Sequence, residues 1–311
     1  MSTHDVPRTP RGAASPTPAA PVALPDALAG VRVVCAAVNV PGPRAAARLR
    51  DMGASVVKVE PPAGDPLAVA APAWYAEMAS GAEVVAIDLK SSAGRAEVGR
   101  LLAEADVLVT SHRPSALRRM GLAGAVVRHP RLCHVEIVGD VADPERPGHD
   151  LTFQADEGLV AAPGLPRTLA ADLAGAEAAA SAALGLLLRR ASSGEGGQVV
   201  VGLRQAADSI ADPLRHGLTV PGGTLGGGLP VYGVYEVADG HVAVAALEPH
   251  FIRRLAEAIN APIPSGTTPA GALAAVDAEF GKRLAAFLRG RPTASVLRWA
   301  DDHDLPVAAV R

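Results

Sequence analysis

The feature that most constrains this chain is a repeated alternation of short apolar runs with segments of helical character in its first two thirds. A short apolar run bounded by turn residues predicts a buried strand, and strand, crossover helix and strand in succession predict a parallel βαβ unit. The predicted strands are 31–38, 55–60, 84–89, 106–110 and 132–138, and the predicted helices are 44–52, 92–104 and 114–120. This alternation predicts an α/β fold built on an open, doubly wound parallel sheet.

The later part of the chain has a different pattern. An alanine-rich helix is predicted at 169–190, then a strand at 198–203 and a helix at 205–212. A glycine-rich stretch at 222–228 follows, and a hairpin is predicted from 231–237 and 241–247 around Ala238-Asp239-Gly240. Further helices are expected at 249–259, 278–289 and 293–302. We therefore expect a disordered tail at 1–25, a large domain at 26–222 and a smaller α+β domain at 223–311.

Composition excludes several classes of partner and location. The net charge of −3 gives no bulk attraction to nucleic acid or to an anionic membrane. Asp172 and Glu177 interrupt the most apolar region, so no membrane span is expected. The tail lacks the apolar stretch of a secretory signal. Cys35 and Cys133 each lie in an apolar run and are expected to be buried free thiols, so a cytoplasmic protein is predicted.

Glycine spacing argues against nucleotide chemistry. Neither 222–228 nor the segment after the first strand has the spacing of a phosphate-binding loop or of the dinucleotide fingerprint. The sheet is therefore not expected to bind nicotinamide or flavin. On these grounds 222–228 is interpreted as a mobile linker.

His149 is the first candidate for chemistry. It lies in a turn, Pro147-Gly148-His149-Asp150-Leu151, and an imidazole can accept and return a proton near neutral pH. Taken alone, the histidine is a weak signal. Asp172 alone is typical of a helix N-cap, and Glu248 before Pro249 is typical of a solvated helix start.

Several stretches in order resemble one family, the family III CoA-transferases, which include the CaiB/BaiF proteins and the α-methylacyl-CoA racemase branch. The stretches are 28–33 (LAGVRV), 42–43 (GP), 52–61 (MGASVVKVEP), 87–90 (IDLK), 105–109 (ADVLV), 113–114 (RP), 119–122 (RMGL) and 194–199 (GEGGQV). The racemase branch is similar in three further features: Gly148-His149-Asp150, Glu248-Pro249 and the hairpin at 232–241. The resemblance implies a Rossmann-like large domain, a smaller second domain and an interlocked homodimer that acts on an acyl-CoA thioester.

The resemblance also implies roles for individual residues. His149 and Asp172 would exchange a proton at the thioester α-carbon, and Glu248 would orient His149. Asp150 is expected to hold the turn, and backbone N–H groups at the start of the helix containing Leu173 are expected to stabilise the enolate. The glycine-rich stretch becomes a candidate lid.

Coenzyme A binding is expected at Val40, Lys58 and Arg113. No metal and no cofactor beyond the coenzyme A of the substrate are predicted. Two positions where the family carries cations differ in this chain, because Pro61 and the stretch 78–83 contain none. The chain ends at 305–311, so we expect it to lack the segment that returns to the large domain.

Three hypotheses follow from these residues. The first is an enzyme resembling α-methylacyl-CoA racemase, which moves a proton at the α-carbon of a CoA thioester. The second is a CoA-transferase that forms an acyl intermediate on Asp172. The third, motivated by the missing cations, is a non-catalytic relative that acts as a binding partner.

Overall fold

The structure, a computed structural model, describes residues 26–261, 263 and 268–311. The predicted tail at 1–25 lies outside the described residues. The chain divides into two compact units, with the boundary between Ser209 and Ile210. The sequence places this boundary near 222. The glycine-rich segment packs against the first strand of the second unit, and so the chain joins that unit earlier than expected.

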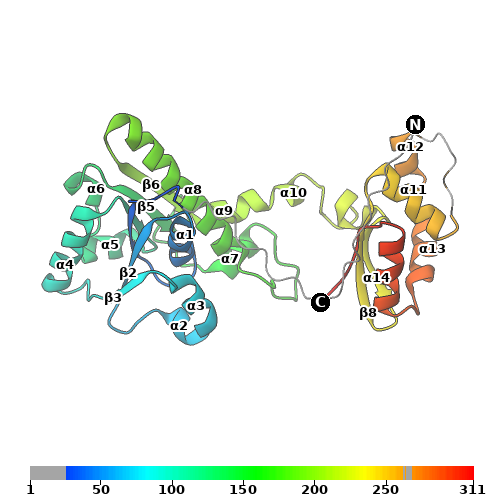
Figure 1. The fold of residues 1–311 in the computed structure, drawn as a ribbon, viewed down its shortest axis with the longest axis horizontal. Helices are drawn as coiled ribbons and strands as arrows, with labels where there is room; N and C mark the ends of the chain where they lie inside the picture. Colours follow the sequence, from blue (N-terminus) through cyan, green and yellow to red (C-terminus); the bar gives the residue numbers. More distant parts are fainter. Residues whose placement is uncertain (1–25, 262, 264–267) are drawn as a thin grey trace. The chain divides into compact units, whose positions relative to one another are not determined.

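The first unit is built on a six-stranded sheet in which every pairing is parallel (Figure 1). Its strands are β1 (Arg32–Ala36), β2 (Ser55–Glu60), β3 (Glu83–Ala86), β4 (Val107–Thr110), β5 (Cys133–Val138) and β6 (Gly197–Gly202). Their spatial order is β3-β2-β1-β4-β5-β6, which is the doubly wound order of Rossmann-like folds. The predicted open parallel sheet is confirmed.

Helices cover both faces of this sheet. One face packs against α1 (Pro41–Arg50) and α8 (Ala170–Ser193), and the other packs against α4 (Ser92–Glu104), α5 (Pro114–Met120) and α6 (Ala125–Arg128). The two cores divide the strands by side-chain alternation, so that Val33 and Cys35 face one layer while Val34 and Ala36 face the other. Cys35 and Cys133 are both buried and free, as predicted.

Helix α8 is long and apolar enough to cross a membrane by length and composition. In the structure its alanines form part of the core against α1 and β5, because small side chains allow close approach of the backbone. Helix α1 begins at Pro41, where the sequence predicts a turn at 41–43. Proline at the first helical position costs no hydrogen bond, and this explains the earlier start.

The order of the strands reverses between β1 and β4, which are neighbours in the sheet. In open parallel sheets, ligands bind at the carboxyl ends of the strands beside such a reversal. The loops after β1, β4 and β5 all begin at this edge. The remaining helices of the unit are α2 (Pro66–Ala70), α3 (Pro72–Ala79), α7 (Asp150–Asp156) and α9 (Leu203–Ile210).

The second unit is a smaller α+β fold with its own core. The predicted hairpin forms from β7 (Tyr232–Val237) and β8 (Gly240–Ala245), and β9 (Val307–Ala309) adds a third antiparallel strand. The helices are α10 (Asp212–Arg215), α11 (Pro249–Ala258), α12 (Pro269–Ala274), α13 (Ala278–Leu288) and α14 (Thr293–Asp302). The glycine-rich segment forms a compact turn, η1 (Thr224–Gly228), which is closed by backbone hydrogen bonds such as Gly222 N–H to Gly226 O at 2.8 Å. This segment is therefore more ordered than a linker.

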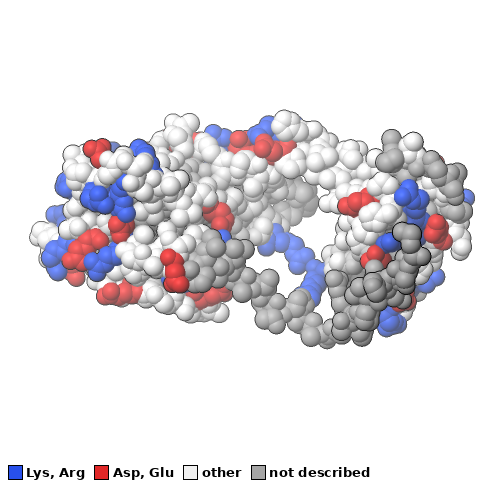
Figure 2. All heavy atoms as spheres, turned by 45° about the horizontal axis from the view of Figure 1, so that its top comes forward, with Lys and Arg blue, Asp and Glu red and all other residues white. Residues whose placement is uncertain are grey.

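Acidic and basic side chains are interspersed on the face shown in Figure 2. Within the described residues, acidic and basic side chains also form ion pairs, such as Arg32 with Glu104 and Arg48 with Glu177. This mixed surface agrees with the small net charge of the chain.

Candidate active site

A pocket of about 310 Å³ lies at the carboxyl edge of the first unit's sheet. The loop after β1 contributes Asn39, the loop after β4 contributes Arg113, and the loop after β5 contributes His149. Asp172, in the first turn of α8, and Leu203, at the start of α9, also line the pocket. The structure therefore brings His149, Asp172 and Arg113 to one pocket within a single unit.

His149 is the N-cap residue of α7 and is exposed. Its backbone N–H donates to Thr152 Oγ1 at 3.1 Å, and Thr152 Oγ1 donates to the His149 carbonyl at 2.7 Å. The preceding Gly148 lies against Phe153, where a Cβ atom would come within 2.5 Å of the ring. Phe153 is almost fully buried and lines the pocket. The absence of a side chain at Gly148 therefore allows the loop before His149 to pack directly against the Phe153 ring.

Asp150 connects the histidine loop to the helix of Asp172. Its side chain is buried, with Oδ1 accepting the Asp172 backbone N–H at 3.0 Å and Oδ2 accepting Gln154 Nε2 at 2.6 Å. Gln154 Nε2 also donates to the Thr168 carbonyl at 3.0 Å, just before α8. Asp150 thus connects α7 to the start of α8. This role is wider than the expected one of holding its own turn.

Asp172 supplies the carboxyl group of the pocket lining. Burial raises its pKa, the nearby Asp150 carboxylate raises it further, and the result is about 7. An ordinary aspartate is fully ionised at neutral pH, whereas the raised pKa of Asp172 makes both its protonated and its ionised form accessible near pH 7. A group in this state can both donate and accept a proton near pH 7.

The expected enolate donors at the start of α8 are not free at two positions. The Asp172 N–H is bonded to Asp150, and the Leu173 N–H is bonded to the Leu169 carbonyl at 2.9 Å. The Leu173 bond is the first intrahelical bond of α8, which begins at Ala170, and the Asp172 bond is made by the buried Asp150 carboxylate. The expectation is therefore wrong for these two N–H groups.

Arg113 is exposed at the N-cap of α5 and borders the pocket beside His112. Burial lowers the pKa of His112, although a hydrogen bond with the Ala36 backbone opposes this effect. A neutral imidazole and an exposed guanidinium thus follow one another in the sequence at the pocket edge. Only the guanidinium suits a phosphate contact at neutral pH.

The structure places Val40 and Lys58 away from this pocket lining. Val40 is 3% exposed and packs in a small cluster with Leu67 and Met78, although its neighbours Asn39 and Pro41 border the pocket. Its side chain is therefore part of the core.

Lys58 is equally buried and forms ion pairs with Glu60 and with Asp65, the latter at 2.7 Å. Burial opposes its charge, but the bonds to Asp65 and Glu60 outweigh this opposition and raise the lysine pKa. Tyr75 Oη also donates to Glu60, at 2.9 Å. This enclosure argues against a direct phosphate contact by Lys58.

Asp65 is a residue that sequence reasoning missed. Its Oδ1 accepts the N–H groups of Leu67 at 2.9 Å and of Asn39 at 3.0 Å. Asn39 has a left-handed backbone, with φ of 65°, and borders the pocket. The Lys58–Asp65 pair therefore fixes the pocket wall indirectly. An Asp-Pro pair before a helix signals an N-cap, but nothing local signals the reach to Asn39.

Glu248 lies in the second unit, where it is the exposed N-cap residue of α11. The expected role of Glu248 in orienting His149 stays a prediction.

Comparison with known proteins finds relatives of this chain by sequence and by fold. The chain is 30% identical over 224 residues to cinnamoyl-CoA:phenyllactate CoA-transferase of Clostridium sporogenes, covering 62% of this chain and 54% of the relative. It is 29% identical over 257 residues to human alpha-methylacyl-CoA racemase, covering 75% of this chain and 65% of the relative. The chain thus spans less than two thirds of the length of both relatives.

Its fold resembles a crystal structure of the hypothetical protein Rv3272 from Mycobacterium tuberculosis. The TM-score is 0.79 at 24% identity, covering 92% of this chain and 86% of that chain. The profile of the family described as CoA-transferase family III matches residues 28–311. The chain belongs to CoA-transferase family III.

Proposed function

We propose that this protein moves a proton at the α-carbon of an acyl-CoA thioester, as an α-methylacyl-CoA racemase does. The observation that carries the proposal is the pocket that holds His149 together with Asp172, whose pKa is raised to about 7. General acid–base catalysis is most efficient when the pKa of the group lies near the working pH. The raised pKa of Asp172 brings this carboxyl group near the pH at which proton transfer is most efficient, and His149 lines the same pocket.

The chemistry needs one base and one acid on opposite faces of the α-carbon. One group takes the α-proton, which leaves an enolate of the thioester, and the other returns a proton to the opposite face. His149 comes from the loop before α7 and Asp172 from α8, so two separate elements carry the two groups. Arg113 is proposed to contact a coenzyme A phosphate, and Glu248 to orient His149.

A CoA-transferase that uses Asp172 as nucleophile is the second candidate. Its support is the Clostridium sporogenes relative, which is named as a CoA-transferase. Such a nucleophile attacks as the carboxylate, and the raised pKa disfavours this form of Asp172. The racemase chemistry uses both forms of the carboxyl group, and for this reason we prefer it.

The test incubates the full chain with a panel of acyl-CoA thioesters, including 2-methylacyl-CoA, in deuterium oxide. We expect one deuterium at the α-carbon, read by mass spectrometry. His149→Gln and Asp172→Asn should each slow this exchange by roughly 10²–10⁴-fold, which is the usual contribution of a general acid or base. His216→Gln, an exposed histidine outside the pocket lining, serves as the matched control and should exchange normally.

The outcomes separate the hypotheses. An acyl group trapped on Asp172, with coenzyme A passing between two acids and no α-exchange, would replace the racemase with the transferase. Absence of both reactions with every thioester would leave the binding-partner hypothesis.

A further inference from the structure

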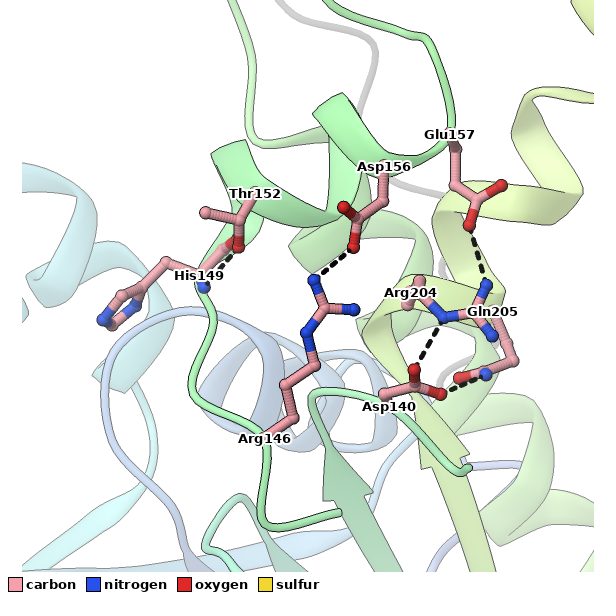
Figure 3. Close-up of polar contacts among 8 residues, drawn as sticks. All are labelled: Asp140, Arg146, His149, Thr152, Asp156, Glu157, Arg204 and Gln205. Carbon is pink, nitrogen blue, oxygen red and sulfur yellow. Dashed lines mark hydrogen bonds and ion pairs between the residues drawn. The ribbon is translucent and has the colours of Figure 1, made fainter. Parts of the chain in front are cut away.

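Beside the pocket, a cluster of polar side chains contacts the loop that carries His149. The loop runs from Gly139, after β5, to His149, before α7. Figure 3 shows the cluster on one side of this loop and the His149 ring pointing away from it. Its central residue is Arg204, the second residue of α9.

Arg204 binds both ends of the segment that contains His149. Its Nε donates to Asp140 Oδ2 at 2.8 Å, at the start of the loop, and its Nη1 donates to Glu157 Oε1 at 2.8 Å, at the end of α7 (Figure 3). The Arg204 backbone N–H donates to the Gly139 carbonyl at 2.9 Å. One residue thus fixes where the loop leaves the sheet and where the helix ends.

The carboxylates that receive these bonds are well shielded from solvent. The side chains of Asp140 and Glu157 are 8% and 15% exposed, against 29% for Arg204. Bonds from Arg204 and Gln205 lower the Asp140 pKa to about 2. Charge-assisted bonds in such a setting hold geometry more firmly than exposed ion pairs do.

Three further contacts tighten the loop. Gln205 Nε2 donates to Asp140 Oδ1 at 2.7 Å, and Gln205 Oε1 accepts the Val141 N–H at 3.2 Å. Arg146 Nη2 pairs with Asp156 Oδ2 at 2.8 Å, which ties the middle of the loop to α7 (Figure 3).

The same junction supports the opposite side of the pocket. Leu203, which precedes Arg204, lines the pocket and packs on Gly175 of α8, where a Cβ atom would lie 2.4 Å from Leu203 Cδ2. Asp172 lies one turn earlier on α8. Adjacent residues of α9 therefore contact the segments that carry His149 and Asp172.

We propose that Arg204 is a positioning residue, which sets the place of His149 relative to Asp172 by joining Asp140 and Glu157. It does not touch the reacting atoms. The inference rests on the proposed proton transfer for its kinetic readout, but its structural readout is independent of that reaction. Small misplacements of catalytic groups reduce turnover strongly, while ground-state binding of substrate is largely kept.

The test compares Arg204→Gln, Arg204→Lys and Glu157→Gln in the full chain. Lysine keeps the charge but cannot reproduce the two-branched geometry of a guanidinium, so it should restore only part of the effect. Glu157→Gln is the milder variant, because Asp140 keeps its partner. Arg190→Gln is the matched control, since Arg190 pairs with Asp106 at 2.8 Å in the same unit and is absent from the pocket lining.

The first readout is NMR of the histidine rings, with the His149 signal assigned by its loss in His149→Gln. We expect one sharp His149 signal in the parent protein and in Arg190→Gln, and a broadened or doubled signal in Arg204→Gln and Glu157→Gln. The second readout is α-deuterium exchange on 2-methylacyl-CoA. In Arg204→Gln, kcat should fall by about 10-fold or more, with KM changed less than about threefold.

An unchanged His149 signal, or a loss of kcat no greater than that of Arg190→Gln, would overturn the positioning role. If Arg204→Gln does not fold, the same criteria apply to Arg204→Lys and Glu157→Gln. A parent protein that exchanges no thioester would refute the proposed function, while the histidine signals would still decide the role of Arg204.

Discussion

The Asp150 carboxylate affects Asp172 in two ways, through its backbone position and through the pKa of its side chain. The Asp150 carboxylate accepts the Asp172 N–H and so holds the first turn of α8 in place. The same negative charge, together with burial, disfavours ionisation of the Asp172 side chain. A contact that fixes the geometry of the group therefore also adjusts its proton affinity.

Replacing Asp172 by asparagine should stabilise the protein at alkaline pH. The Asp172 pKa rises from 3.8 in the unfolded chain to about 7 in the fold, so between these values the folded state holds more protons. Stability is thus lost as pH rises through this window. We expect Asp172→Asn to raise the free energy of unfolding by about 1–3 kcal/mol at pH 8 and to have no effect near pH 4.

Urea unfolding of both proteins across this pH range measures the difference. A stability gain that is equal at pH 4 and pH 8 would contradict the raised pKa.

Lys58 is a second residue whose charge is used within the fold. Its replacement by methionine would leave Glu60 and Asp65 buried without their cation. Removing one partner of a buried ion pair costs about 3–5 kcal/mol, and we expect a loss of this size in Lys58→Met.

The matched control is Arg32→Gln, which breaks an ion pair with side chains 58% and 69% exposed and should change stability by less than about 1 kcal/mol. Chemical denaturation compares the two variants. Equal losses of unfolding free energy in the two variants would show that the buried ion pairs of Lys58 stabilise the fold no more than an exposed ion pair does.

At the scale of elements, the packing of α8 against its neighbours requires small side chains. Gly175 faces Leu203 of α9 so closely that a methyl group there would collide with it, whereas a methyl group on Gly185 of the same helix would meet no atom within 4 Å. Glycine elsewhere in a helix costs stability relative to alanine. Close packing therefore requires glycine at position 175 but not at position 185 of the same helix.

The pair gives a matched experiment. Gly185→Ala should stabilise the protein by about 0.5–1 kcal/mol through helix propensity alone. Gly175→Ala should destabilise it by about 1–2 kcal/mol, since the cost of overpacking exceeds that gain. Thermal unfolding measures both, and stabilisation by Gly175→Ala would show that Leu203 moves aside without cost.

Much of the element pattern could be predicted from sequence. The strand 55–60 and the helices 92–104 and 114–120 have the predicted bounds, because their apolar spacing and flanking turn residues agree. Helix α7 was missed, since its first residues were interpreted as part of the turn at 147–151. The gathering of His149 and Asp172 rested on family resemblance, because contacts between distant segments leave no local pattern.

The buried polar contacts could not be predicted at all. Asp65, Gln154 and Arg204 are polar residues, which on composition alone are expected at the surface. Their bonds join segments 26, 14 and 64 residues apart, respectively. Only the folded topology brings such partners together.

At the scale of the whole molecule, the two units have separate hydrophobic cores. The core of the second unit includes Val242, Leu255 and Leu284, and it shares no residue with the cores around the six-stranded sheet. Each unit is thus able to open without removing the core of the other.

Leu284→Ala, at a fully buried position of α13, should weaken the second unit by about 2–5 kcal/mol. We expect faster amide hydrogen exchange in β7, β8 and α14, and unchanged protection in β1 to β6. Leu108→Ala in β4 is the converse variant. Loss of protection in both units after either change would indicate a single cooperative structure.

The raised pKa of Asp172 has one more consequence. Any ligand that makes the surroundings of Asp172 drier or more charged also changes how many protons the carboxyl group holds. Association at neutral pH would then draw protons from the solvent or release them to it. The heat of association measured by calorimetry would then differ between buffers of unlike ionisation enthalpy. The measured heat would include the heat of protonating or deprotonating the buffer.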